Sequence, residues 1–546
     1  MQLSTLLLGG GGKSLTSLFS LVYLFVFLPG CIIVYTALPK KCKKYFLLLA
    51  SYAFFWLISS SLIIYLILTT FSAHYFGIWL DRIGTQMRSH LAELPKEERK
   101  AAKAVCVSKQ RRVLALAVIL HIGLLLVLKY SPFFTTNINT LLSKLGVSVQ
   151  LEVPAAIMPI GISFFTLQAV SYVIDVCRGV VKAEDDLFKL ALFISFFPAI
   201  IEGPICRYGQ TADQLWDCDK IQYKNLTFGI QRILWGMLKK VVVADRLNNF
   251  VTTIFDTDKD YSYGGAIIAI AAVLYTVQLY MDFSGSMDAV IGTAEIFGIT
   301  MPENFRRPFF SRTISEFWQR WHISLGAWFK DYIFYPVTTS KKMKKLTSSA
   351  RKKLGSHYGP LIAGAVALFC VWFCNGLWHG SAWSFIFFGM YHFVLILTGN
   401  ILEPLVQAVN KKLHINSGWF VYRLLQIIRT GVLVIIGELF FRARGLKAGM
   451  MLFGRIFTDQ RFEEVNEKVF DKLRLDTYDL IIVGITLLIV FTVSILNERG
   501  VCIRESLAKR HIALRWAVLY GLILFIIVFG AYGGTYAPVD PMYAQF

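Results

Sequence analysis

Apolar runs of roughly membrane-spanning length recur along the whole chain, separated by short polar or basic stretches. A bilayer core needs about 20 consecutive apolar residues per helix. The clearest candidates are Leu15–Leu38, Ser61–Leu80, Val113–Leu128, Ala155–Ile174, Ala266–Phe283, Leu361–Leu377, Trp383–Leu402, Leu425–Phe441, Leu480–Leu496 and Trp516–Tyr532. Shorter or interrupted runs, which predict further spans, re-entrant segments or interfacial helices, are Tyr45–Leu57, Leu187–Ile201, Ile230–Val243 and Ala289–Ile299. We therefore expect an all-α polytopic membrane protein with about 11 transmembrane helices plus re-entrant and interfacial helices.

Composition supports the same class of protein. Of the 546 residues, 55% are hydrophobic and 15% are aromatic. Soluble domains have a lower apolar content and interleave it with charge. No repeat, low-complexity segment or soluble second domain is visible, so residues 1–546 are expected to form a single membrane domain.

The formal net charge of +21 is concentrated in a few short loops. The basic clusters are Lys40–Lys44, Arg82–Arg112, Lys341–Lys353 and Arg499–Arg515. Loops rich in Lys and Arg lie on the cytoplasmic side of a membrane, so these clusters indicate topology and not a nucleic-acid partner. With these loops inside, the N-terminus and the C-terminal tail, residues 533–546, are both expected outside.

The cysteines give no indication of a metal site. None of the nine forms a C-x-x-C pair, and Cys370 and Cys374 lie one turn apart in an apolar run. Buried free thiols are the expected state for such residues. We therefore predict neither a metal nor a bound cofactor.

The first of three unusual polar stretches runs from Pro159 to Arg207. Pro159 and Gly161 interrupt an apolar run, and Glu202 follows within a second apolar segment. Irregular backbone at membrane depth is tolerated only where protein or a water-filled cavity surrounds it. The stretch predicts a broken or re-entrant helix beside a cavity.

The second stretch, Tyr280–Tyr332, mixes aromatic rings with Arg and Lys. This composition suits a membrane interface, where rings lie at the level of the lipid headgroups. An interfacial amphipathic helix would explain it fully. The same cations would also serve an anionic acyl donor such as an acyl-coenzyme A.

The third stretch, Asn375–Trp383, contains His379 where one apolar run ends and the next begins. A lone histidine beside an apolar helix is more often structural than catalytic. Here Gly376 and Gly380 would leave room for a substrate, and Trp378 and Trp383 would wall a dry pocket. An imidazole with a pKa near 6.5 can take a proton from a hydroxyl and return it to a leaving thiolate.

Four motifs in this order resemble the membrane-bound O-acyltransferase family. They are Tyr280-Met-Asp-Phe-Ser-Gly285, Pro302-Glu-Asn-Phe-Arg-Arg-Pro308, Phe317-Trp-Gln-Arg-Trp-His-Ile-Ser-Leu325 and Leu377-Trp-His-Gly380. The resemblance covers residues 159–389, a motif-bearing catalytic core, and is strongest to the bacterial alginate O-acetyltransferase branch. The teichoic acid D-alanyl transfer proteins are also similar.

The resemblance implies helices around a central funnel, with the acyl donor in the cytoplasm and the acceptor outside. It assigns catalytic roles to His379 and His322. The substrate or tunnel-lining residues that it implies are Asp282, Asn304, Arg320, Trp321, Asn375 and Trp378. It further implies acetyl-CoA as donor, a bacterial plasma-membrane location, and partners that comprise an extracytoplasmic esterase-like acetyltransferase and polysaccharide export or synthesis proteins.

The last residues, Asp540–Phe546, resemble a tyrosine-containing ending of related acyl-export systems, in which the tyrosine is thought to carry the acyl group. A frayed terminus is the simpler interpretation. If the resemblance holds, Tyr543 accepts the acyl group with help from His379 and passes it on. Pro541 and Met542 depart from the larger apolar residues expected ahead of the tyrosine.

Two enzyme functions and two non-enzymatic ones remain open at this point. O-acetylation of a cell-surface or exported polysaccharide is the leading hypothesis, and D-alanyl transfer to teichoic acid is the alternative. A transporter would be expected to show matching interrupted helices in both halves, and none is visible. An inactive scaffold would leave His379, His322 and Tyr543 unexplained.

Overall fold

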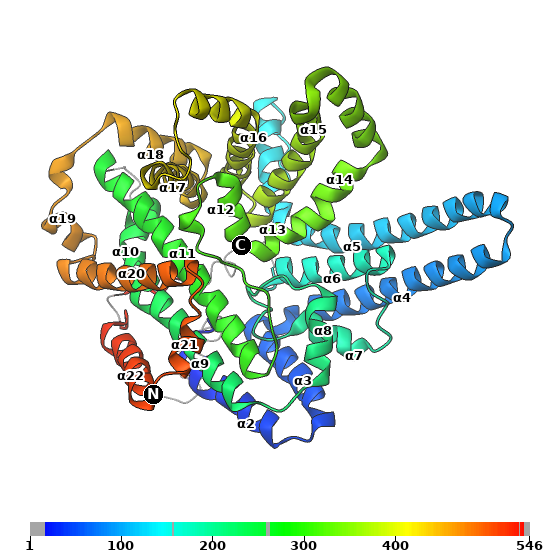
Figure 1. The fold of residues 1–546 in the computed structure, drawn as a ribbon, viewed down its shortest axis with the longest axis horizontal. Coiled ribbons are helices and arrows are strands. Elements are labelled where there is room, and N and C mark those ends of the chain that lie inside the picture. The colour runs from blue at the N-terminus through cyan, green and yellow to red at the C-terminus, as the bar shows by residue number, and fades with distance from the viewer. Residues whose placement is uncertain (1–16, 155–157, 258–261, 534–535, 540–546) are drawn as a thin grey trace. The chain divides into compact units, whose positions relative to one another are not determined.

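The computed structural model describes residues 17–154, 158–257, 262–533 and 536–539, and the regular secondary-structure elements within these residues are all helices (Figure 1). Within these residues the only β pairing is an isolated antiparallel bridge between Phe305 and Trp321. Eight helical stretches there are long and apolar enough to cross a membrane: Lys40–Glu93, Lys96–Lys144, Gly265–Ile296, Lys341–His379, Trp383–Lys412, Phe420–Arg442, Thr477–Glu498 and Ile512–Phe529. The all-α polytopic class is confirmed, whereas the estimate of about 11 spans stays a prediction.

The chain divides into two compact units, which we describe separately. Unit 1 contains the described part of residues 17–233 together with residues 287–302. Its elements are η2 (Tyr23–Phe27), α2 (Leu28–Ala37), α3 (Lys40–Ser59), η3 (Ser60–Leu62), α4 (Ile63–Glu93), α5 (Lys96–Lys144), α6 (Ile162–Arg178), α7 (Leu187–Ser195) and α8 (Tyr208–Asp217). Helices α9 (Tyr223–Met237) and α11 (Gly265–Ile296) contribute residues to both units.

Unit 2 contains residues 234–286 and 303–539, apart from those outside the described ranges. Its first elements are η4 (Leu238–Ala244), α10 (Asp245–Thr252), η5 (Thr253–Thr257), η6 (Pro308–Phe310), α12 (Ile314–Arg320), α13 (Ile323–Phe329), η7 (Lys330–Phe334) and α14 (Tyr335–Thr339). The remaining ones are α15 (Lys341–His379), α16 (Trp383–Lys412), α17 (Phe420–Arg442), α18 (Leu446–Thr458), η8 (Phe462–Glu464), α19 (Glu467–Lys472), α20 (Thr477–Glu498), α21 (Ile503–Ala508) and α22 (Ile512–Phe529).

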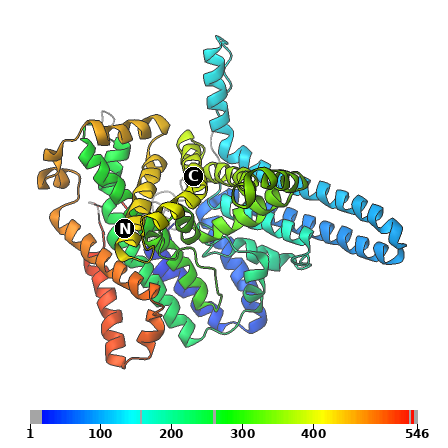
Figure 2. The ribbon, with the colours of Figure 1, turned by 45° about the horizontal axis from the view of Figure 1, so that its top comes forward.

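Within unit 1, α4 and α5 form a long helical hairpin. Pro95 separates them because a proline cannot continue α4, and it becomes the N-cap of α5. Helix α6 packs against both partners. In its second half α5 changes direction (Figure 2), where Pro132 removes a backbone donor from the helix interior.

In unit 1, α6 begins at Ile162, and the described residues 158–161 before it are not helical, so the predicted broken or re-entrant helix at Pro159 stays a prediction. Gly161 has φ +78° and precedes α6, and a Cβ there would lie 2.0 Å from the Ile200 carbonyl oxygen. Only glycine combines this left-handed backbone with so close an approach. The irregular chain between α7 and α8 is buried over residues 196–206, which agrees with the expectation that protein surrounds such backbone. The expected cavity stays a prediction.

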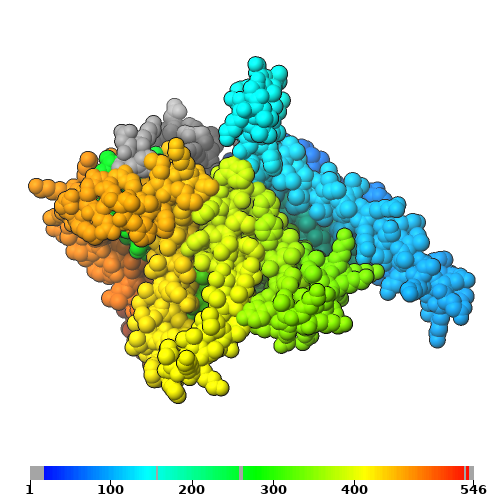
Figure 3. Space-filling view, turned by 90° about the horizontal axis from the view of Figure 1, so that it is seen from above, coloured from blue at the N-terminus to red at the C-terminus, as the bar shows by residue number. Residues whose placement is uncertain are grey.

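Within unit 2, α15 and α16 lie side by side (Figure 3), and glycines set their spacing. A Cβ on Gly376 would lie 2.6 Å from the Phe385 carbonyl oxygen. A Cβ on Gly389 would lie 2.3 Å from the Trp372 carbonyl oxygen. Small residues allow membrane helices to approach this closely.

The substitution Gly389→Ala is therefore expected to destabilise the protein by about 1–3 kcal/mol, because the added methyl group forces α15 and α16 apart. Thermal unfolding in detergent would measure the loss. The matched control is Gly399→Ala in the same helix, where a Cβ meets no atom within 4 Å. The control should be neutral or slightly stabilising, and equal effects of the two substitutions would contradict this account.

Candidate active site

His322 is held by a short backbone pairing in unit 2. It lies between α12 and α13 with φ 46°, a left-handed conformation that is uncommon for residues other than glycine. The Arg306 N–H donates to the Arg320 carbonyl at 2.9 Å, and the Ile323 N–H donates to the Asn304 carbonyl at 3.0 Å. These bonds flank His322 on both sides and fix its backbone.

The Asn304 amide orients the His322 ring. Its Oδ1 accepts from the Ser324 N–H at 3.0 Å and from the Ser324 hydroxyl at 2.9 Å, and it lies 3.3 Å from His322 Nδ1. Because an amide oxygen only accepts, this contact favours the tautomer with the proton on Nδ1. Nε2 is then the basic nitrogen of the ring.

The His322 side chain is almost fully buried, with 3% of its surface exposed, and it lies outside the eight candidate spans. Burial lowers its pKa from 6.5 to about 3, because desolvation penalises the charged imidazolium. The unfolded chain therefore takes up a proton as the pH falls below about 6.5 while the native His322 stays neutral. The stabilisation that the neutral His322 contributes is therefore fully present above about pH 6.5 and is lost progressively as the pH falls toward 3.

Wild-type protein is thus expected to lose up to about 1.4 kcal/mol of stability per pH unit below about 6.5 through this residue. His322→Gln should flatten that slope. Unfolding midpoints in detergent between pH 7.5 and 4.5 would measure it, with His90→Gln at an exposed position of α4 as control. Identical slopes for wild type and His322→Gln would refute the assignment of a neutral buried imidazole.

His379 is the last residue of α15 and is also buried, with 5% of its surface exposed. Its ring centroid lies 5.0 Å from that of Trp378 and 5.1 Å from that of Phe441 in α17. The Trp378 ring in turn lies 5.6 Å from the His322 ring. One tryptophan therefore bridges two histidines that are far apart in the sequence.

One detail of the expected pocket is wrong. Gly376 and Gly380 do not leave room for a substrate: Phe385 fills that space, and a Cβ on Gly380 would lie 2.2 Å from its ring. Trp383 has 54% of its surface exposed, and its expected role as a pocket wall stays a prediction. Small residues at a helix crossing serve packing here, and the aromatic wall around His379 comes from Trp378, Phe388 and Phe441.

Asn375 lies one helical turn before His379, so the two side chains share a face of α15. The Asn375 side chain is buried, with 7% of its surface exposed. Its Oδ1 has no hydrogen-bond partner among the residues that the structure describes. A buried amide oxygen in this state is a candidate substrate contact.

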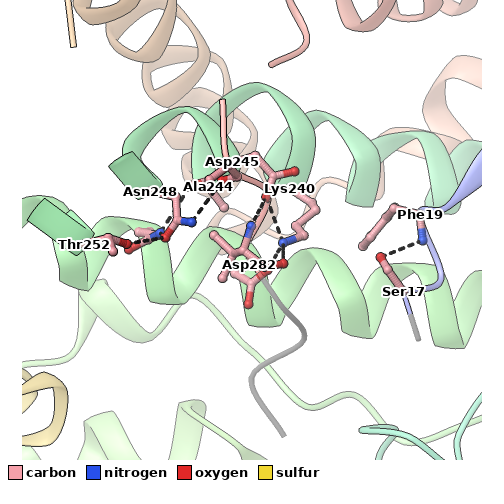
Figure 4. A network of polar contacts seen from close by, with 11 residues as sticks. Ser17, Phe19, Lys240, Ala244, Asp245, Asn248, Thr252 and Asp282 are labelled. Atoms are coloured by element: carbon pink, nitrogen blue, oxygen red, sulfur yellow. Dashed lines mark hydrogen bonds and ion pairs between the residues drawn. The ribbon is translucent and has the colours of Figure 1, made fainter. Parts of the chain in front are cut away.

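The remaining residues that were expected at the site are Asp282, Arg320, Trp321 and Tyr543. The first three do not belong to the aromatic wall around His379. Asp282 pairs with Lys240 at 2.8 Å (Figure 4). Arg320 pairs with Glu316 at 2.8 Å and with Glu498 at 3.2 Å, so carboxylates of its own chain already engage it. Trp321 is buried among aromatic rings, including Phe305 at 5.0 Å. Tyr543 lies outside the described residues.

Sequence reasoning missed several buried ionisable groups. Lys240 lies in the expected run Ile230–Val243, and Glu438 lies in the run Leu425–Phe441 with 2% of its surface exposed. His392 in α16 has no exposed surface, and its Nδ1 accepts from the Trp318 indole N–H at 3.2 Å. An ionisable residue inside an apolar run is itself a signal, and it could have flagged all three.

The helical membrane fold brings two buried imidazoles, His322 and His379, to the ring of Trp378, which makes this cluster the candidate site for acid–base chemistry. The family model of the membrane-bound O-acyltransferases matches residues 183–351. The chain is 30% identical to the probable alginate O-acetylase of Azotobacter vinelandii, over 84% of this chain and 81% of that protein. The chain therefore belongs to the membrane-bound O-acyltransferase family.

Two further relatives differ in their named acyl group. The peptidoglycan O-acetyltransferase of Helicobacter pylori is 29% identical over 62% of this chain and 64% of its own length. The teichoic acid D-alanyltransferase of Bacillus subtilis is 31% identical over 45% of this chain and 59% of its own length. The protein is thus a multi-pass membrane O-acyltransferase.

Proposed function

We propose that this chain moves an acetyl group from cytoplasmic acetyl-CoA to an extracytoplasmic hydroxyl, for O-acetylation of a cell-surface or exported polysaccharide. The observation that carries the proposal is the buried pair His322 and His379, bridged by Trp378. The names of the acetylating relatives, which match over more of the chain than the D-alanyl relative, favour acetyl over D-alanyl.

His379 acts as the general base in this proposal. Its imidazole takes the proton of the acceptor hydroxyl while the oxygen attacks the thioester carbonyl carbon. A C–O bond forms, the C–S bond breaks, and the departing coenzyme A thiolate receives the proton from the imidazolium. His322, neutral and oriented by Asn304, positions the donor near Trp378. The Asn375 amide oxygen accepts a hydrogen bond from the substrate.

Tyr543 is the first acceptor in the proposed sequence. A phenol with a pKa near 10 is a better leaving group than a sugar hydroxyl, so an acetyl-tyrosine stays activated for a second transfer. Such a covalent intermediate divides one difficult step into two easier ones. A separate extracytoplasmic esterase-like acetyltransferase would receive the acetyl group, and polysaccharide export or synthesis proteins would accompany it.

The proposed setting is the bacterial plasma membrane with both chain termini outside. The Lys341–Lys353 cluster supports it, because that cluster begins α15 whereas His379 ends it. The chain would then enter α15 from the cytoplasm and carry His379 toward the opposite face.

Donor competition tests the proposed acyl group. Purified protein in nanodiscs should transfer label from acetyl-CoA, unlabelled acetyl-CoA should suppress the transfer, and a D-alanyl-loaded carrier protein should not. Suppression by the D-alanyl carrier, together with transfer of labelled D-alanine, would establish the alternative function. Absence of transfer from either donor would overturn the acyltransfer proposal for the isolated chain.

A further inference from the structure

The first part of α15, in unit 2, carries a strong positive charge. Seven of its thirteen residues from 341 to 353 are Lys or Arg, and all seven side chains are exposed. We call residues 341–353 the basic segment. Its cations are Lys341, Lys342, Lys344, Lys345, Arg351, Lys352 and Lys353.

No carboxylate of the chain neutralises the basic segment. The sequence contains no acidic residue between Asp331 and Glu403. Within the part of the chain that the structure describes, none of the seven cations takes part in an ion pair. Like charges at positions i and i+4 of a helix, such as Lys341 and Lys345, repel each other. An anionic surface outside the chain would relieve this repulsion.

A sharp bend separates the basic segment from the rest of α15 (Figure 1). Gly355 has φ 79° and ψ −175°, which are not helical angles. A Cβ on Gly359 would lie 2.4 Å from the Arg351 Cα, although a straight helix separates two residues of this spacing by about 12 Å along its axis. The basic segment therefore folds back against the start of the second part of α15.

The length of the second part places the bend at a surface of the bilayer. Residues 360–379, which end at His379, already supply the roughly 20 residues that a bilayer core needs. The basic segment lies outside that length and beside its first turn. Clusters of Lys and Arg immediately next to a spanning helix attract the anionic headgroups of the cytoplasmic leaflet.

Exposed apolar and aromatic side chains accompany the cations. Leu346 and Leu354 are exposed, as are Tyr335 before the segment and Tyr358 after it. Ala350 is buried, so one face of the segment packs against protein. Cations mixed with leucine and tyrosine are typical of a segment at the level of lipid headgroups. This mixture favours a lipid surface over a soluble acidic partner.

We propose that the basic segment binds the phosphate groups of anionic phospholipids in the cytoplasmic leaflet. Its ammonium and guanidinium groups contact the lipid phosphates, while Leu346 and Leu354 reach the boundary of the acyl chains. This role goes beyond acyl transfer and does not depend on it. Lipid bound here holds one end of the helix that carries His379 at its other end.

Hydrogen–deuterium exchange of the full chain in nanodiscs gives a local test. One set of nanodiscs contains phosphatidylcholine alone, and the other contains phosphatidylcholine with phosphatidylglycerol. Mass spectrometry follows the peptides that cover residues 341–354. Phosphatidylglycerol should slow amide exchange in these peptides. The exposed start of α5 is the internal control, because Glu97 and Glu98 stand among its cations and a smaller effect is expected there.

Four substitutions made together test whether the charge is responsible. The variant Lys341→Gln, Lys342→Gln, Lys344→Gln, Lys345→Gln is expected to lose the protection by phosphatidylglycerol, because each cation near an anionic surface contributes roughly fivefold in affinity. Arginine at the same four positions keeps the charge and should keep the protection. Unchanged exchange in α16 would show that both variants are folded.

Equal exchange of the basic segment in the two kinds of nanodisc would overturn the proposal, as would protection that survives in the glutamine variant. Slower exchange in phosphatidylcholine alone after addition of acetyl-CoA, without any effect of phosphatidylglycerol, would assign the cations to the phosphates of the donor and reject the lipid. A segment that responds to neither would leave an acidic protein as its partner and would reject the lipid equally.

Discussion

Replacing His379 with alanine is expected to lower the rate of acetyl transfer from acetyl-CoA by about 10²–10⁴-fold, the usual contribution of a general base. The imidazole sits at the end of α15 among Trp378, Phe388 and Phe441. In the proposed mechanism this imidazole takes the proton of the attacking hydroxyl, so the substitution removes the general base. Release of coenzyme A thiol by purified protein in nanodiscs measures the rate.

The control for this substitution is His357→Gln in the same helix. His357 is bonded to the Asn400 carbonyl at 3.0 Å and belongs to the contact between α15 and α16, away from the aromatic wall of His379. The His357→Gln protein should retain most of the acetyl-transfer activity. A His379→Ala protein that unfolds at the wild-type temperature and still releases thiol at a comparable rate would remove His379 from the mechanism.

Tyr543→Phe is expected to reduce the O-acetyl content of the cell-surface polysaccharide to the level found with His379→Ala. The substitution removes only the phenolic oxygen, so no acetyl-tyrosine can form and the two-step route is closed. Base-released acetate from cells that carry the variant as their only copy measures the effect.

Tyr532→Phe serves as the matched control in the same C-terminal segment. The Tyr532 hydroxyl donates to the Ile526 carbonyl at 3.2 Å, a local contact that has no part in the proposed transfer. Its loss should leave polysaccharide acetylation near the wild-type level. Normal acetylation in Tyr543→Phe cells would show that the acetyl group bypasses the tail.

The membrane class of the fold was predictable because apolar runs of spanning length are a direct consequence of bilayer thickness. The residues at which the helices begin and end were not predictable in the same way. The run Val113–Leu128 marks only part of α5, which continues over Lys96–Lys144 because its charged N-terminal part contains no helix-breaking residue. Conversely, α3 ends at Ser59 between the runs Tyr45–Leu57 and Ser61–Leu80, where Ser60 has a positive φ of 48° that no hydropathy pattern identifies.

The candidate site was predictable as a set of residues but not as an arrangement. Motif order pointed to His322 and His379, and Trp378 was expected nearby, yet only the tertiary structure shows that its ring joins the two. Glycines at 376 and 380 were misinterpreted because a close helix contact and an open cavity require the same residue type. The pairing of Asp282 with Lys240 depends on two distant segments meeting, which sequence spacing does not encode.

Mass spectrometry of the C-terminal peptide, after incubation of the purified chain with labelled acetyl-CoA, tests the whole account most directly. The account predicts a labelled acetyl group on Tyr543 that is absent from His379→Ala and Tyr543→Phe proteins. Label that reaches an added hydroxyl acceptor without ever appearing on Tyr543, or an adduct that persists in His379→Ala, would contradict it.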